Sequence, residues 1–544
     1  MAKRMVTIFF IALGCCFLLF AMMFIVLFLA PGFSIFGIKY LRAGTHHLNA
    51  QNVNIYELVG EGFSGSITFE TKEIPINVYF TEKQNDSITN DGFFFTYVDN
   101  FEGITTSSFD DPSYSIKKDL VGNVTIKTKE YEKLIFESST STRYFNLYIP
   151  IEYIDSAAPY DRINLTINAG KAPVTFIKET VEDLRTPAFN KLSITTNGKV
   201  DFKTHVYAST YQLTTNNSIE IGENKNIGIE AYNMDLFSKK GAITLKRAID
   251  GDLTAKTVNR NIKIVGCRNL KIETSYGSVS GYGENKISTT GLVNITTKAG
   301  DITLGKVDGT GTNKIVTSTG SVSIDSIEDG SLTTSAGAIR IKSVNNFKIS
   351  TNVGKVIVEQ AKTSLDVTTK RGNIVLGGEG MVMSNVSAYS RLGKINVSNA
   401  SGKVNLQTNQ SDITFKNKDS KDITISCGDE LVATNLEGKV TISSVSNVNL
   451  KFSEISDTTT ISLGSECTSA KIEALNNNIN NTKYIFSGKN VTIWESNGVG
   501  TGSFSRKDVG KALSNPTLTG NFPYIKITGK YVDIVVYFDS SAQI

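Results

Sequence analysis

Histidine and cysteine, the side chains most often used to bind metals or to move protons, are scarce in this sequence. The 544 residues contain 3 His and 5 Cys. His46 and His47 are adjacent and His205 stands alone, so there is no pair of ligands with the spacing of a zinc site. The sequence therefore predicts no metal site and no cofactor, and we interpret His46 and His47 as part of a solvated linker.

Three short motifs resemble parts of known sites, but each lacks a required feature. Residues 62–66 (GFSGS) do not have the Gly-x-Ser-x-Gly spacing of a nucleophile elbow. Residues 498–502 (GVGTG) are rich in glycine but follow no βαβ pattern, which a phosphate-binding loop would need. Residues 377–380 (GGEG) resemble the start of a Ca²⁺-binding nonapeptide, but Val382 stands where an Asp is required. We interpret all three motifs as loops.

The overall composition excludes several classes of protein. Hydrophobic residues make up 40% of the chain, too many for a disordered polypeptide, and the 45 Gly and 9 Pro follow no collagen triplet. The 56 Lys and Arg against 52 Asp and Glu leave a net charge of +4, too dilute for a nucleic-acid binder. Five cysteines in so long a chain cannot form a disulfide framework.

A template of apolar positions recurs at intervals of 17 to 21 residues and is the most informative feature of the chain. The residue two places after each anchor is aliphatic and β-branched, and apolar residues also stand four places after it and five before it. The anchors, which we interpret as structural turn positions, are Gly300, Gly320, Gly337, Gly354, Gly372, Gly393 and Ser411.

This template predicts an all-β fold, a single-stranded parallel β-helix (β-solenoid). Alternation after each anchor places two side chains on one face of a short strand, and glycine suits the bend before it because it accepts a positive φ. One such unit cannot bury its few aliphatic side chains, but stacked units can. A β-sandwich or propeller is the alternative, although propeller blades need about 40 residues each.

The pattern divides the chain into five parts. We expect residues 1–4 to be a short cytoplasmic tail, 5–38 a transmembrane helix with its exit turn, and 39–155 a linker and N-terminal β cap module. Solenoid repeats are expected over 156–495. Residues 496–544 are predicted to form C-terminal cap strands, because 524–527 and 532–538 are more aromatic than the repeats.

The predicted membrane helix depends on the absence of any charged residue over 5–38. The apolar run over residues 6–30 is long enough, as a helix, to cross a hydrocarbon core of roughly 30 Å, and Pro31-Gly32 would end it. A cleaved signal peptide is the alternative, but its apolar region is typically shorter. Lys3 and Arg4 on one side nearly balance Lys39 and Arg42 on the other, so the charges favour a cytoplasmic N-terminus only weakly. Isolated cysteines and polar β segments favour the placement of residues 45–544 outside the cytoplasm.

Polysaccharide lyases and hydrolases also use β-helices, so catalysis has to be weighed. Such an enzyme needs acids or bases at equivalent positions of neighbouring turns. Of the residues directly after the seven anchors, Asp301 and Asp412 are the carboxylates, and they stand six repeats apart. We therefore predict no catalytic residues, while a site on irregular loops remains an alternative.

Residues 144–150 (YFNLYIP), 163–170 (INLTINAG) and 348–358 (KISTNVGKVIV) resemble a widespread bacterial adhesin-like family of Gly-punctuated β-repeats. In that family a strand ending in Pro leads into a row of strand pairs separated by Gly. The resemblance covers about residues 140–460. It implies a β-solenoid on the cell surface or in the envelope, usually with a membrane anchor, and it supplies no catalytic residues.

Together these observations predict a single-pass membrane protein whose surface-exposed solenoid acts as an adhesin-like binding or spacer protein. The expected partners are the membrane and a surface polymer, a glycan or another envelope protein, with no nucleic acid. An envelope sensor or regulator is one alternative, and a polysaccharide-active enzyme is another. A membrane-tethered β-helix polymer would need the opposite topology and uncapped ends.

Overall fold

The computed structural model describes most of the chain and divides it into two compact units, Met1–Gly251 and Asp252–Ile544. The described residues are 11–23, 42–55, 65–81, 94–105, 114–128, 140–150, 163–178, 188–204, 206–222, 231–477, 481–496, 504–514 and 522–539. Residues 11–23 form a helix, and the rest of the segment predicted to cross the membrane lies outside these ranges. Among the described residues, no helix is both long enough and apolar enough to span a bilayer.

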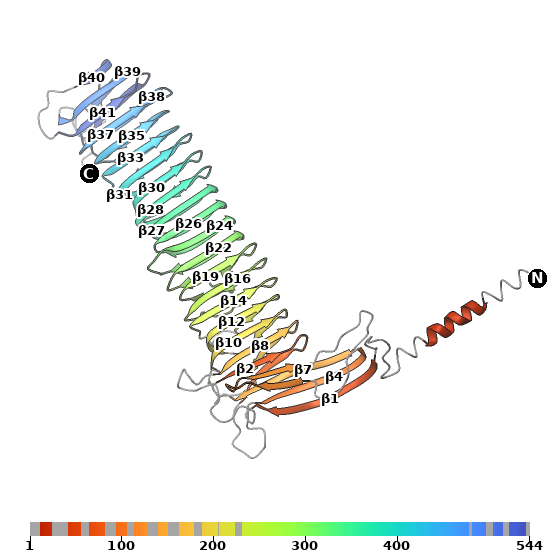
Figure 1. Cartoon of the computed structure of the whole chain (residues 1–544). Coiled ribbons are helices and arrows are strands. Elements are labelled where there is room, and N and C mark those ends of the chain that lie inside the picture. The colour runs from red at the N-terminus through yellow and green to blue at the C-terminus, as the bar shows by residue number, and fades with distance from the viewer. Residues whose placement is uncertain are drawn as a thin grey trace, which may run out of the picture. The chain divides into compact units, whose positions relative to one another are not determined.

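The first unit consists of short strands that stack side by side in two ladders (Figure 1). Its strands are β1 (Arg42–Asn54), β2 (Ser66–Glu70), β3 (Ile76–Thr81), β4 (Phe94–Thr105), β5 (Tyr114–Lys118), β6 (Val124–Thr128), β7 (Thr140–Pro150), β8 (Asn164–Gly170), β9 (Val174–Lys178), β10 (Ala188–Thr196), β11 (Val200–Phe202), β12 (Tyr207–Thr215), β13 (Ile219–Ile221), β14 (Asn233–Ser238) and β15 (Ile243–Leu245). One ladder runs β5, β6, β2, β8, β10, β12, β14, and the other runs β1, β4, β7, β3, β9, β11, β13, β15.

The order of the first turns in space differs from their order in the chain. The turn made by β2 and β3 pairs in parallel with β8 and β9 on one side and with β6 and β7 on the other. Antiparallel strands complete this end, since β5 pairs with β6, and β4 lies between β7 and β1. Parallel turns thus extend into residues 39–155, the range that the sequence assigned to a cap module.

The second unit continues with two ladders of the same kind, and β18, β21 and the end of β23 add a short third ladder. Figure 1 shows the stacked strands of this unit. Its strands are β16 (Asp252–Thr257), β17 (Ile262–Ile264), β18 (Gly266–Cys267), β19 (Leu270–Thr274), β20 (Val279–Gly281), β21 (Ile287–Thr289), β22 (Val293–Ala299), β23 (Ile302–Val307), β24 (Asn313–Thr319), β25 (Val322–Ile327), β26 (Gly330–Ala336), β27 (Ile339–Val353), β28 (Val356–Thr369), β29 (Ile374–Leu376), β30 (Met383–Ser390), β31 (Ile395–Thr408), β32 (Ile413–Asn417), β33 (Asp422–Cys427), β34 (Leu431–Leu436), β35 (Lys439–Ser444), β36 (Val448–Phe452), β37 (Thr458–Leu463), β38 (Ser469–Leu475), β39 (Lys483–Ser496), β40 (Phe504–Ser514), β41 (Tyr524–Thr528) and β42 (Asp533–Asp539).

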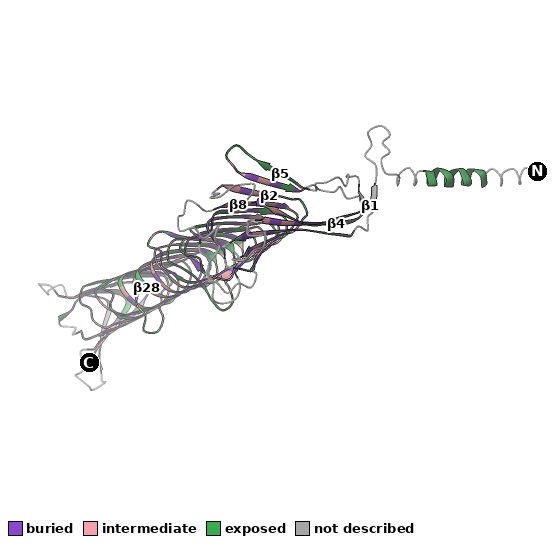
Figure 2. Cartoon of the chain, turned by 90° about the horizontal axis from the view of Figure 1, so that it is seen from below, coloured by how far each residue is buried: buried purple, intermediate pink, exposed green. Residues whose placement is uncertain are grey.

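The predicted apolar columns are in register in this unit. Each residue two places after an anchor pairs with its equivalent in the next turn, as Ile302 does with Val322 and Val322 with Ile339. The column five places before the anchors is equally continuous, and these side chains are buried. Inward aliphatic residues alternate with outward polar ones along the strands (Figure 2). The described strands of the two units make about 15 turns, and the predicted parallel β-solenoid is confirmed.

The last turns of the second unit are also out of chain order. The strands predicted as terminal caps, β41 and β42, pair in parallel with β37 and β38 on one side and with the two halves of β39 on the other. The outer edge of β39 is covered by the antiparallel strand β40. The aromatic strands near the C-terminus therefore form an inner turn, and the covering strand comes from earlier in the sequence. Antiparallel pairing at the end of a stack protects an otherwise open strand edge.

Candidate functional site

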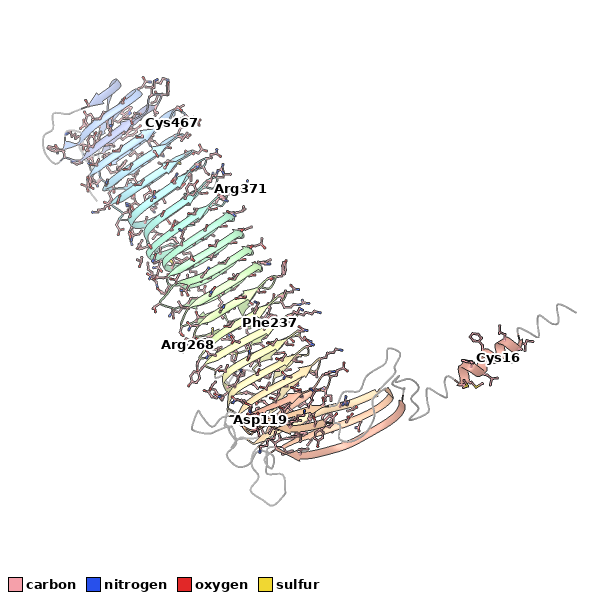
Figure 3. All side chains as sticks on the ribbon, in the orientation of Figure 1. Cys16, Asp119, Phe237, Arg268, Arg371 and Cys467 are labelled. Atoms are coloured by element: carbon pink, nitrogen blue, oxygen red, sulfur yellow. The ribbon has the colours of Figure 1, made fainter. Side chains whose placement is uncertain are left out.

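The glycines at the predicted turn positions lie above one another at the bends of the second unit. Gly300, Gly320, Gly337 and Gly354 have φ between 135° and 143°, a region that disfavours other residues, whereas Gly372 and Gly393 have no such angle. At all six, a Cβ atom would come within 3.0 Å of the carbonyl oxygen of the glycine one turn earlier. Close approach of the stacked bends thus requires glycine even where the backbone angle does not. Arg371, beside one of these bends, is labelled in Figure 3.

A column of buried hydroxyl groups accompanies the glycine column. A Thr or Ser stands three places before each anchor, and each is paired in register with the next. The members are Thr297, Thr317, Thr334, Thr351, Thr369, Ser390 and Thr408. Their oxygens bond to backbone groups of the bend: Ser390 Oγ accepts from the Gly393 N–H at 2.8 Å, and Thr408 Oγ1 donates to the Ser411 carbonyl at 2.6 Å. This column was missed from the sequence, although the recurring Thr or Ser before the anchors is its signal.

Cys427 continues this column, between Thr408 and Ser444. Its thiol is buried and donates to the carbonyls of Asp429 and Glu430 at 3.4 and 3.3 Å. Burial raises the pKa of the Cys427 thiol. The thiol therefore replaces a structural hydroxyl and is poorly suited to nucleophilic chemistry.

The other residues that suggested chemistry in the sequence take structural or undescribed places. His46 and His47 lie in β1, with side chains outside the described set, and His205 and residues 498–502 are also outside it. Gly377 and Gly380 have positive φ values in the loop before β30. Within the described residues, no group of three or more His, Cys, Asp and Glu side chains could hold a metal ion.

The two carboxylates that follow anchors both connect neighbouring turns. Asp301 Oδ1 accepts a hydrogen bond from the Ser321 N–H at 2.8 Å. Asp412 forms an ion pair with Lys394 at 2.8 Å, and the hydrogen bond from Lys394 lowers the pKa of Asp412. The structure does not bring Asp301 and Asp412 together, since they stay on turns far apart in the ladder.

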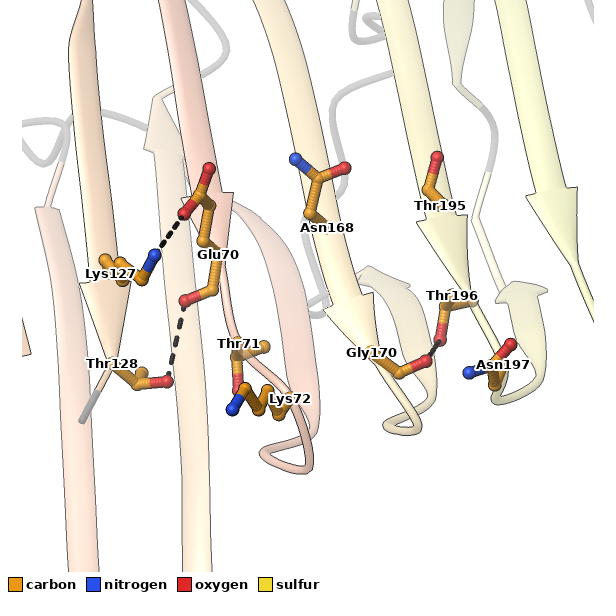
Figure 4. Close-up of a pocket in the computed structure, with 10 residues that line it drawn as sticks. All are labelled: Glu70, Thr71, Lys72, Lys127, Thr128, Asn168, Gly170, Thr195, Thr196 and Asn197. Atoms are coloured by element: carbon orange, nitrogen blue, oxygen red, sulfur yellow. Dashed lines mark hydrogen bonds and ion pairs between the residues drawn. The ribbon is translucent and has the colours of Figure 1, made fainter. Parts of the chain in front are cut away.

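A cavity of about 390 Å³, with polar side chains at its rim and mostly apolar atoms in its wall, lies over the ends of β6, β2, β8 and β10 in the first unit (Figure 4). Lys127, Glu70, Asn168 and Thr195 form one row across these strands, because they are paired in register. Lys127 Nζ lies 3.1 Å from Glu70 Oε2, and both side chains are partly exposed. The cavity therefore offers an ion pair, an amide and a hydroxyl to a small polar molecule.

A smaller groove of about 270 Å³ lies on the ladder formed by β28, β29, β31 and β32 in the second unit. Lys355, Asn373 and Lys394 line one side, and Val375 and Asn396 come from the neighbouring outward row. Lys394 already bonds to Asp412, so much of the charge in this groove is neutralised within the protein. The groove could accept a polar chain lying across the turns.

A buried charge pair joins β4 and β7 near the covered end of the first unit. Asp99, which is 0% exposed, lies opposite Arg143, and Arg143 Nε is 2.9 Å from Asp99 Oδ1. Tyr97 Oη donates to Asp99 Oδ2 at 2.9 Å and accepts from Arg143 Nη2 at 2.8 Å. Burial raises the pKa of Tyr97, so its hydroxyl stays protonated. The three groups hold the register of the two antiparallel strands.

Comparisons with known proteins add no relatives: no family model, no curated protein and no solved structure matches this chain. The structure bears out the β-solenoid, and the adhesin-like β-repeat family stays a prediction from the residues quoted above.

Proposed function

We propose that this protein is a membrane-anchored, surface-exposed β-solenoid that acts without catalysis, as an adhesin-like binding or spacer protein. The observation that carries the proposal is the division of each turn into a largely apolar inner face and a polar outer face. Outward rows of Thr, Ser, Asn and Lys repeat from turn to turn and present hydrogen-bonding groups over a long surface. Such a surface suits an extended partner better than a small substrate.

The membrane anchor is supported by the exposure of the N-terminal helix. Every side chain of residues 11–23 is exposed, including Phe17 at 76% and Phe20 at 64%. Continuous exposed apolar surface of this kind is stabilised by transfer into lipid. We place residues 1–4 in the cytoplasm, 5–38 in the membrane and 45–544 outside the cytoplasm.

The covered ends of the solenoid argue against a polymer. Strands β5 and β4 at one end of the first unit, and β40 at the end of the second, are antiparallel to the turns that they cover, and β1 pairs in turn with the outer edge of β4. An additional parallel turn from a second molecule would have to displace them.

The cavity beside Glu70 and Lys127 favours one second candidate, an envelope sensor or regulator. Its row of ionic, amide and hydroxyl groups is suited to a small polar ligand. Since residues 1–4 would be the cytoplasmic part, such a sensor would need a partner to carry a signal.

Protease treatment of intact cells, followed by detection of fragments, tests the location. We expect residues 45–544 to be digested while cytoplasmic control proteins stay intact. Full protection of this region would overturn the surface proposal. An array of glycans and matrix proteins, probed with the detergent-solubilised chain, then separates a binding protein from a spacer or sensor.

A further inference from the structure

We propose that the outward face of β31, β33, β35 and β37 in the second unit binds a neutral, hydroxyl-rich linear polysaccharide. This inference rests on the proposed binding function and deepens it, since it names the surface and the class of polymer. The four strands are neighbours in one ladder, as Figure 1 shows.

The face carries two parallel rows of uncharged polar side chains. Register pairing aligns the members of each row across the four strands. The first row is Asn405, Thr424, Thr441 and Thr460, and the second is Gln407, Ser426, Ser443 and Ser462. Adjacent strands lie about 4.8 Å apart, a spacing comparable to the length of one pyranose unit, and the two rows lie about 7 Å apart. Three successive turns repeat the triplet Thr-Ile-Ser.

The hydrogen-bonding capacity of these eight side chains is not used within the described structure. None of the eight makes a hydrogen bond or ion pair with another described residue. On the other ladder, by contrast, Arg340 pairs with Glu359 at 2.9 Å, and Lys394 with Asp412. Hydroxyl and amide groups both donate and accept, which matches the hydroxyl groups of sugars.

Charge selects a neutral polymer over an acidic one. The charged residues of this face, Lys403, Asp422 and Lys439, belong to a border row and alternate in sign. Within the four strands neither inner row contains a Lys or Arg, and Lys526 of β41, which pairs with Thr460, continues the first row beyond its last member. A polyanion would therefore gain a counter-charge at one end of the face and not along it.

The face is also rigid before any ligand binds. Ile425, Ile442 and Ile461, the central residues of the three triplets, are at most 1% exposed and hold the strands against the core. The outward Thr side chains are β-branched and have few rotamers to lose. Ordering them costs little, so many weak hydrogen bonds along a polymer can add up. Because the two rows extend over four turns, one sugar would contact a small part of them and an extended chain would contact them all.

The test uses the full-length protein in detergent and compares its retention on insoluble cellulose and chitin with its retention on immobilised alginate. The variant Thr424→Val, Thr441→Val, Thr460→Val removes three hydroxyls with little change of shape. A matched control, Thr244→Val, Thr303→Val, Thr434→Val, makes the same change at outward positions away from this face and from the groove beside Lys394. Circular dichroism of both variants establishes that the turns still form.

We expect the unchanged protein and the control to bind a neutral polysaccharide, and the first variant to bind it at least about tenfold more weakly. If the first variant binds the neutral polysaccharide as tightly as the unchanged protein does, this face is not the binding surface. The same conclusion follows if the unchanged protein prefers alginate and the first variant keeps that preference. In both cases the protein would still be a binding protein. If the unchanged protein binds none of the polymers, the inference is wrong, and the protease experiment still decides the surface location separately.

Discussion

Replacement of Gly393 by alanine should destabilise the solenoid through contact between turns and not through backbone strain. Gly393 does not have a left-handed φ, so alanine can adopt its backbone conformation. The added Cβ would, however, lie within 3.0 Å of the Gly372 carbonyl oxygen and 2.8 Å from Ser390 Oγ. Ordinary van der Waals contact begins at 3.4 Å, so the two bends must separate by more than 0.4 Å.

This separation is large enough to break a hydrogen bond between the turns. The Arg391 N–H donates to the Thr369 carbonyl at 3.2 Å, and a further 0.4 Å takes the pair beyond hydrogen-bonding distance. The stronger bond from the Ile374 N–H to the Lys394 carbonyl, now 2.8 Å, would lengthen. Loss of about 1 kcal/mol for the broken bond, together with about 1–3 kcal/mol of steric strain, gives about 2–4 kcal/mol in the free energy of unfolding.

Urea denaturation followed by circular dichroism measures this loss, and amide hydrogen exchange at Ile374 and Arg391 locates it. The matched control is Gly380→Ala. Gly380 has a φ of +70°, but no atom lies within 4 Å of the position that the new Cβ would take, so the control adds backbone strain without a contact between turns. The control should lose about 1–2 kcal/mol from backbone strain, with no faster exchange at the bend. If Gly393→Ala is as stable as the unchanged protein, or if its exchange at Ile374 and Arg391 is unaltered, close approach of the bends does not explain the glycine column.

Four further outcomes are expected. Asp99→Asn should lower the free energy of unfolding by about 3–5 kcal/mol, since it leaves the Arg143 guanidinium buried without its counter-charge; a loss below about 1 kcal/mol in urea denaturation would contradict this role. Cys427→Ser should cost less than Cys427→Val, because the hydroxyl keeps the bonds to the bend carbonyls, and equal urea midpoints for the two would show that those bonds contribute nothing. Burial raises the pKa of Cys267 to about 12. The contribution of this thiol to stability is therefore complete below its ordinary pKa of about 8.5 and is lost as the pH approaches 12. In thermal melts at successive pH values, Cys267→Ala should make this loss of stability with pH smaller. The hydrogen bonds from Lys199 and then Lys246 lower the pKa of Glu220. The contribution of this carboxylate to the stability of the fold is therefore present above its ordinary pKa of about 4.3 and is lost as the pH falls through the lowered pKa. An NMR titration in which the Glu220 carboxyl has its ordinary pKa would refute this prediction.

The repeating core was predictable from the sequence because its determinants are local. Alternation over three or four residues decides which side chains point inward, so Ile302, Val322 and Ile339 align on the sequence pattern alone. The bend glycines were recognisable for the same reason. The reason for glycine at Gly372 and Gly393 was not, because it depends on the distance between turns, which no single repeat reveals.

The candidate surfaces were less predictable. The cavity beside Glu70 arises because strands from residues 66–70, 124–128 and 164–170 become neighbours, and nothing in their local patterns specifies that order. The uncharged face was not recognised from the sequence, although the repeated Thr-Ile-Ser triplet is its signal, because its significance depends on which neighbouring side chains remain unbonded.

The sequence by itself determined the inward and outward face of each strand, the spacing of the turns and the parallel stacking of the repeats, since all three follow from short-range alternation and the need to bury aliphatic side chains. Tertiary structure alone decided how the stack is closed. The turn of β2 and β3 lies between two turns that come later in the chain, and the turn of β41 and β42 lies between two turns that come earlier. Antiparallel strands then cover the ends of the stack. Any strand with a compatible alternating pattern could pair at an open edge, so the choice among them depends on non-local pairing that local periodicity does not encode.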